Sequence, residues 1–111
     1  MVKQGTIIKI NFNPQSGHEQ AGYRPAVVIS NDIFNEKARL SIVCPITNTN
    51  NDFPLHVPLD TRTKTTGVIL CEHIKALDLN SRTYQVIENL PKDILQNVID
   101  IVYSVIEQIE D

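Results

Sequence analysis

Residues 17–30, GHEQAGYRPAVVIS, place several groups that could do chemistry directly before a run of β-forming residues. His18 can move protons at neutral pH, and Glu19 could act as a base or accept a hydrogen bond from a hydroxyl. Arg24 precedes Pro25 and the apolar run, so its guanidinium would leave a rigid strand edge and present planar donors to a phosphate. The alternative is a polar turn with an exposed Arg–Glu pair and a solvated histidine.

A second polar segment, residues 47–51 (TNTNN), follows a predicted strand that ends in Pro-Ile. The Thr47 hydroxyl and the amides of Asn48 and Asn50 can donate to a phosphate or to the edge of a base without adding charge. An ordinary Asx-rich hairpin loop would explain the same residues. Both interpretations stay open on this segment alone.

A third polar segment is Glu72-His73-Ile74-Lys75, which follows four apolar residues. Strand alternation would place His73 and Lys75 on one face of the sheet. That face could bind a ligand, and it could equally be the solvated end of a strand.

The remaining chemistry-bearing residues argue against a metal or a nucleotide cofactor. The histidines are scattered, no zinc-type or calcium-loop spacing occurs, and no glycine-rich phosphate loop is present. Cys44 and Cys71 lie in strand-like apolar runs, which favours two buried thiols over a single disulfide. We therefore expect neither a bound metal nor a cofactor.

The elements that must position these groups are mainly β. Alternation and turn residues predict strands over 6–12, 26–29, 40–46, 55–59, 68–71 and 84–88, with a short helical turn within 30–37. The strand over 26–29 is apolar throughout, which predicts burial on both faces. From Pro91 onward the apolar residues repeat with a helical period as far as Ile109. The expected fold is a small, strongly bent antiparallel barrel capped by a C-terminal helix.

Length and charge set further limits. The chain has 111 residues, which predicts one domain over 1–111. Its net charge is −3, but residues 1–90 hold nine Lys/Arg against eight Asp/Glu, so the acidity lies in residues 91–111 and the rest could present a positive face. The apolar runs are too short to cross a bilayer and the N-terminus lacks a signal-peptide pattern, which favours the cytoplasm.

The order of these segments resembles the MazF/PemK (Kid) family of toxin endoribonucleases. The resemblance rests on NFNP followed by G-x-EQ-x-G-x-RP, then PIT at residues 45–47, then TTGVILCEH at residues 65–73. It runs over nearly the whole chain. It implies a small SH3-like barrel with a C-terminal helix, which agrees with the elements predicted above.

The resemblance also implies an activity and partners. Members cleave single-stranded RNA at specific sequences without a metal, as homodimers, and a cognate antitoxin inhibits them by laying an extended acidic segment over the RNA groove. Arg24 and Thr47 match the family's principal catalytic pair. Glu19 matches the glutamate of the EQ motif, and His18 matches a histidine proposed for proton transfer in PemK-like members.

The chain departs from the family pattern at two positions. His73 stands where a glutamine is common, and Leu70 stands where the PemK branch has an arginine. Glu72, directly before His73, matches the acidic residue that the family has at that position. The proton-transfer scheme of that branch therefore does not carry over directly, and either His18 or Glu19 could move the proton.

The chemistry of RNA cleavage assigns a role to each candidate. Arg24 and Thr47 would donate to the charged phosphate, because an arginine is a poor general base. Readout of unpaired bases would rest on hydrogen bonds rather than stacking, since aromatic residues are scarce. The expected RNA-binding residues are Gln20, Asn48, Asn50, Glu72, His73 and Lys75.

Two other functions remain open on the sequence. CcdB-type gyrase poisons share the barrel but depend on a C-terminal tail with tryptophan, whereas this chain ends Ile-Glu-Asp and contains no tryptophan. The other is a catalytically silent barrel that only binds its antitoxin.

Overall fold

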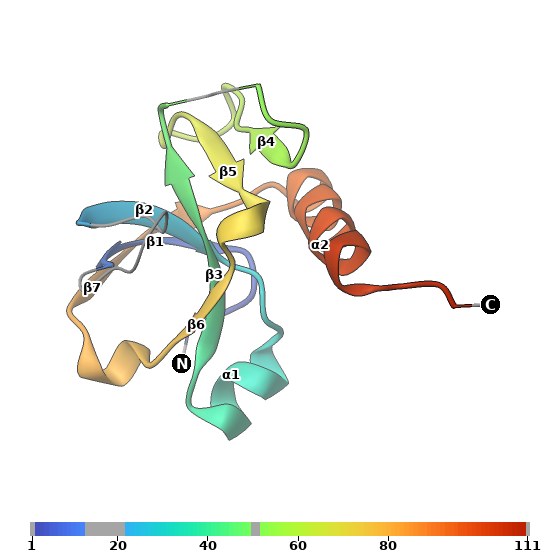
Figure 1. Ribbon diagram of the computed structural model, residues 1–111. Coiled ribbons are helices and arrows are strands. Elements are labelled where there is room, and N and C mark those ends of the chain that lie inside the picture. The colour runs from blue at the N-terminus through green and yellow to red at the C-terminus, as the bar shows by residue number, and fades with distance from the viewer. Residues whose placement is uncertain (1, 13–21, 50–51, 111) are drawn as a thin grey trace.

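The computed structural model describes residues 2–12, 22–49 and 52–110, and consists of an antiparallel β-sheet with one long helix packed against it (Figure 1). The strands are β1 (Thr6–Asn11), β2 (Tyr23–Val28), β3 (Ser41–Thr47), β4 (His56–Pro58), β5 (Val68–Leu70), β6 (Lys75–Leu77) and β7 (Tyr84–Asn89). The helices are α1 (Asp32–Ala38) and α2 (Lys92–Ile106), and two 3₁₀ turns are η1 (Cys71–His73) and η2 (Leu79–Ser81). The predicted fold class is confirmed.

Strand β3 organises the sheet, because it pairs with three neighbours. The strand order is β4-β5-β3-β2-β1-β7, and β6 pairs with β3 as well. The second half of β3 pairs with β5, and its first half, residues 41–43, pairs with β6. Within the described residues no ladder joins β4 to β7, so the sheet bends without closing into the expected barrel.

The apolar second half of strand β2, residues 26–28, is buried on both faces, as its apolar run predicts. Val27 belongs to the helix-side core, the apolar cluster that contains Ile7, Cys44, Ile46, Ile69 and the buried residues of α2. Ala26 and Val28 belong to the far-side core, which contains Ile8, Ile10, Phe12, Val43, Leu77 and Leu79. Successive residues of a strand point to opposite faces, so one short strand supplies both cores.

Helix α2 covers the helix-side core with Ile94, Val98 and Val102, which follow one another at four-residue spacing. The predicted apolar stripe is correct this far and wrong at its end. The helix ends at Ile106, and Ile109 lies beyond it with 85% of its surface exposed, in the C-terminal segment that leads away from the sheet (Figure 1). No helix in the described part of the chain is long and apolar enough to span a membrane.

Both cysteines are buried and unpaired, which confirms the preference for thiols over a disulfide. Burial is the main reason that the pKa of the Cys44 thiol is raised, with the neighbouring Cys71 and Glu72 adding to it. Burial also raises the pKa of Cys71 to about 12. Neither thiol is therefore a nucleophile at neutral pH.

Candidate active site

The ends of the segment that carries the first candidate residues are held together. The Phe12 backbone N–H donates to the Gly22 carbonyl at 2.8 Å, directly beyond the paired residues of β1 and β2. His18, Glu19 and Gln20 fall between these two positions, outside the described residues, and Asn50, in the connection after β3, is outside them too. The roles predicted for these four residues stay predictions.

Arg24 is presented from a strand. It is the second residue of β2 and is exposed, and it lies opposite Ile10 of β1, which in turn lies opposite Tyr84 of β7. Directly opposed residues of antiparallel strands share a face. Arg24 therefore lies on the face of the far-side core, at the end of the sheet where the chain leaves β1 and enters β2.

Thr47 is the last residue of β3 and is buried, with 7% of its surface exposed. Its Oγ1 accepts from the Thr49 backbone N–H at 3.2 Å. The β2–β3 ladder ends at Ala26 opposite Pro45, and two residues further along each strand the corresponding positions are Arg24 and Thr47. The structure therefore brings these two predicted residues to the same end of the same face.

Gly67 packs against Thr47 in a way that only glycine allows. Its φ is +116°, and a side-chain Cβ would lie well inside contact distance of the Thr47 carbonyl oxygen and 2.8 Å from the carbonyl carbon. The adjacent Thr66 Oγ1 donates to the Asn48 Oδ1 at 3.0 Å. Residue 67 thus lies directly against the backbone of Thr47, and residue 66 holds the amide of Asn48.

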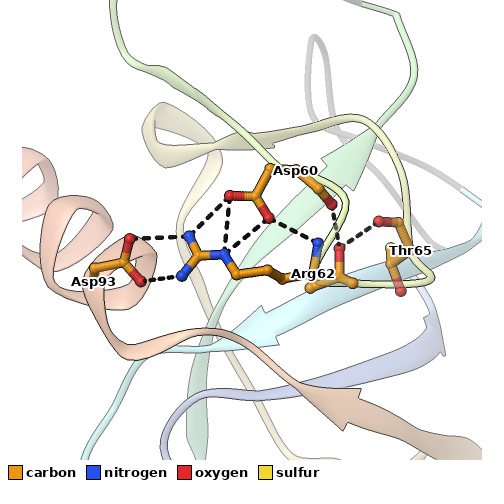
Figure 2. A network of polar contacts seen from close by, with 5 residues as sticks. Asp60, Arg62, Thr65 and Asp93 are labelled. Carbon is orange, nitrogen blue, oxygen red and sulfur yellow. Dashed lines mark hydrogen bonds and ion pairs between the residues drawn. The ribbon is translucent and has the colours of Figure 1, made fainter.

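Arg62 anchors the loop over residues 59–67 to helix α2 (Figure 2). Its guanidinium donates to both oxygens of Asp93, at the start of α2, at 2.8 and 2.9 Å, and to Asp60 within the loop. Hydrogen bonds from Arg62 are the main reason that the pKa values of Asp60 and Asp93 are lowered, and Asp93 in turn is the main reason that the pKa of Arg62 is raised.

Glu88 of β7 holds the same loop from a second side. Its carboxylate accepts from the Lys64 backbone N–H at 3.1 Å and from the Thr65 backbone N–H and Oγ1, both at 2.8 Å. Burial acts to raise the pKa of Glu88, but these hydrogen bonds outweigh it and the pKa is lowered. The loop that supports Thr47 is therefore tied to both α2 and β7.

The loop anchors predict a pH-dependent stability. Because the pKa of Glu88 lies below its usual value of 4.5 in the folded protein, its contribution is complete above that value and is lost as the pH falls through the folded pKa. We expect the parent to melt at a higher temperature than Glu88→Gln at neutral pH. The gap should narrow as the pH is lowered from about 6 to about 3. Melting curves followed by circular dichroism measure this.

A matched control for that experiment is Glu107→Gln, at the exposed C-terminal cap of α2. This variant should follow the parent across the whole pH range, because Glu107 accepts none of the hydrogen bonds that fix the loop. A constant gap between parent and Glu88→Gln would show that the carboxylate does not stabilise the loop through its charge.

The segment Glu72–Lys75 does not continue a strand, so the predicted alternation of His73 and Lys75 is wrong. Residues 71–73 form η1, because the chain must move from the half of β3 that pairs with β5 to the half that pairs with β6. Lys75 then begins β6, with its Nζ 5.7 Å from the centre of the Phe12 ring.

Glu72 is engaged by a residue that the sequence did not single out. Its Oε2 lies 2.8 Å from the Nε2 of His56 on β4, and 3.8 Å from the Nε2 of His73. In the sequence, His56 has no feature that distinguishes it from an ordinary polar residue on the surface of a strand. Only the pairing of β4 with β5, which sets His56 opposite Leu70, brings it to η1.

Across residues 2–12, 22–49 and 52–110, no group of three or more His, Cys, Asp or Glu side chains could hold a metal ion. The polar side chains described at the site, those of Arg24, Thr47 and Asn48, are hydrogen-bonding groups. An arginine and a threonine at one end of a curved sheet, with amides beside them, suit a phosphodiester substrate.

Fold and site together define a small antiparallel-sheet protein with an arginine and a threonine on one face. A sequence profile of the PemK-like, MazF-like toxins of type II toxin–antitoxin systems matches residues 3–106. The chain therefore belongs to this family of toxins. It is 31% identical to "Endoribonuclease PemK" of Escherichia coli over 102 residues, which cover 88% of this chain and 77% of that protein.

Solved structures agree with this assignment. MazF from Deinococcus radiodurans superimposes with a TM-score of 0.88 at 35% identity, over 94% of each chain. The MazE–MazF structure from the same organism gives a TM-score of 0.81 at 35% identity, again over 94% of each chain. The agreement covers the helix as well as the sheet.

Proposed function

We propose that this chain is a metal-independent endoribonuclease toxin that cleaves single-stranded RNA, principally mRNA, at specific sequences. The observation that carries the proposal is the position of Arg24 and Thr47 at the same end of one sheet face, in a member of this toxin family. The relative from E. coli is named an endoribonuclease, which supports the reaction class.

In the proposed mechanism the RNA supplies its own nucleophile, the 2′-hydroxyl. The hydroxyl loses its proton to His18 or Glu19 and attacks the adjacent phosphorus, while the bond to the 5′-oxygen breaks and that oxygen takes up a proton from the protonated base or from water. The products are a 2′,3′-cyclic phosphate and a 5′-hydroxyl. Arg24 and Thr47 donate to the non-bridging oxygens as their negative charge increases in the transition state.

The residues around this pair would select the sequence. Asn48 is held by Thr66, Glu72 is held by His56, and Lys75 sits beside Phe12. Together with Gln20, Asn50 and His73, we assign these groups to contacts with the bases and backbone of unpaired RNA.

Incubation of the purified protein with a long RNA in EDTA tests the proposal. We expect cuts at discrete sequences, with 2′,3′-cyclic phosphate at one end and 5′-hydroxyl at the other. Intact RNA would overturn the proposal, and inhibition of DNA gyrase by the same preparation would identify a poison of the CcdB type. Cleavage that requires added Mg²⁺ would contradict the metal-independent mechanism.

The proposed enzyme works as a homodimer in the cytoplasm and is neutralised by an antitoxin with an extended acidic segment. Exposed apolar residues on β7 and at the end of α2 support a protein partner. These residues are Val86, Ile87, Tyr103, Val105 and Ile106. MazF from D. radiodurans has been crystallised with MazE, which supports an antitoxin partner here. An acidic segment would complement the face that presents Arg24.

A further inference from the structure

His56 lies on the same face of the sheet as Thr47. Thr47 is opposite Val68 in the β3–β5 ladder, and His56 is opposite Leu70 in the β4–β5 ladder. Val68 and Leu70 are two residues apart on β5 and therefore point to the same side. Because opposed residues share a face, His56 and Thr47 are on that side too, with β4 and β5 next to the end of β3 (Figure 1).

The imidazole of His56 is a fixed group. Only 6% of its side chain is exposed, and it forms a T-shaped pair with the Phe53 ring, with centroids 5.5 Å apart. It lies 2.8 Å from the Oε2 of Glu72, whose side chain is 26% exposed. A contact of this kind holds the carboxylate in one orientation before any ligand arrives, so the cost of ordering Glu72 is met during folding.

Two atoms beside this contact lack partners. The Oε1 of Glu72 and the Nδ1 of His73 are buried, and neither makes a hydrogen bond within the part of the chain that the structure describes. A buried polar atom without a partner is costly, and such atoms occur in native proteins where a ligand completes the hydrogen bonding. The edge of an unpaired base carries a donor next to an acceptor, which is the pattern that a carboxylate oxygen and an imidazole nitrogen can meet.

We infer that His56 is a positioning residue for RNA recognition, acting through Glu72. It holds the Glu72 carboxylate on the face that carries Thr47, so that Glu72 and the adjacent His73 select one base of the cleaved sequence. This inference rests on the proposed ribonuclease function. It adds to that function a residue outside the sequence motifs named above and a chemical reason for base selection.

A double-mutant cycle on His56 and Glu72 tests the inference. We expect His56→Ala and Glu72→Ala each to lower kcat/KM for RNA cleavage by roughly 10-fold to 100-fold, mainly through a higher KM. The kcat/KM of the double variant should be no lower than that of the more impaired single variant, because the proposed role of His56 is exerted through Glu72. On a pool of random RNA, both single variants should lose preference at the same one position of the cleaved sequence.

Two conservative variants separate positioning from packing. His56→Gln keeps a donor that can reach Glu72 and should retain the sequence preference of the parent. His56→Asn is too short to reach and should behave as His56→Ala does. Melting temperatures of all variants show which are folded, and if His56→Ala does not fold, the comparison of the Gln and Asn variants with Glu72→Ala decides the question.

The outcomes distinguish this inference from the proposed function. A parent protein that leaves RNA intact overturns the ribonuclease assignment and, with it, the role of His56. A parent that cleaves, together with His56→Ala or His56→Asn of unchanged KM and unchanged preference, overturns the inference alone. Multiplicative losses in the double variant would show that His56 and Glu72 act independently, which also overturns it.

Discussion

Replacing Arg24 with alanine should lower kcat/KM for RNA cleavage by roughly 100-fold to 1,000-fold. The expected loss is large because, in the proposed mechanism, Arg24 is a donor carried on a strand that needs little reorganisation as charge develops on the phosphate. Arg24 is exposed and outside both apolar cores, so the melting temperature should change little. Initial rates on a short RNA that contains one cleavage site measure the effect.

Two further variants show what Arg24 contributes. Arg24→Lys keeps the charge but loses the planar pair of donors, and should recover only a small part of the activity. Lys37→Ala, which removes a positive charge from the last turn of α1, should cleave at the parental rate. If Arg24→Ala cleaves as fast as the parent, or if Lys37→Ala is equally impaired, Arg24 does not stabilise the transition state.

Replacing Gly67 with alanine should destabilise the protein by roughly 2–5 kcal/mol. Two costs add at this position. The φ of +116° is a conformation that side-chain-bearing residues rarely adopt, and the new Cβ would meet the backbone of Thr47, which is itself held in the β3–β5 ladder. Because Thr47 must move to make room, the part of the population that remains folded should also cleave RNA more slowly. Guanidinium denaturation measures the stability.

Gly22→Ala is the matched control for Gly67→Ala. Gly22 also has a positive φ, +83°, but no atom of the described residues lies within 4 Å of the position that its Cβ would take. This variant therefore bears the backbone strain of about 1–2 kcal/mol without a clash against the described part of the chain. Equal losses in the two variants would show that the contact between Gly67 and Thr47 has no special cost. A larger loss of stability in Gly67→Ala than in Gly22→Ala supports the additional cost of the clash with the Thr47 backbone.

Much of the fold could be predicted because apolar periodicity reflects burial directly. The alternation in β1 and the uninterrupted apolar run in β2 follow from the two cores, and the four-residue spacing in α2 follows from the cover of one of them. The limits of the periodic signal were also physical. The apolar spacing continues in the sequence as far as Ile109, but helix α2 ends at Ile106 and Ile109 is exposed.

The supports of the site could not be predicted in the same way. Arg62 pairs with a carboxylate 31 positions away, and Glu88 accepts from a loop 23 and 24 positions away. Charged residues of this kind look like ordinary surface groups in a sequence, because nothing in their local pattern depends on their partner. His56 was missed for the same reason. The η1 turn was missed because residues 71–73 include no glycine, proline or asparagine to mark a break after the apolar strand.

The hydrogen bond between Phe12 and Gly22 has a consequence for how toxins of this kind can diversify. The described ladder of β1 and β2 reaches Asn11 opposite Tyr23, and the Phe12–Gly22 hydrogen bond follows it, so the residues from 13 to 21 are joined to the scaffold at two points that are already fixed. Doubling the length of such a connection costs only about 0.6 kcal/mol. Arg24 and Thr47 belong to the scaffold, whereas His18, Glu19 and Gln20 belong to this interchangeable stretch. In the proposed mechanism, the proton-transfer group can thus be exchanged between relatives by grafting one stretch, without refolding the strands that carry Arg24 and Thr47.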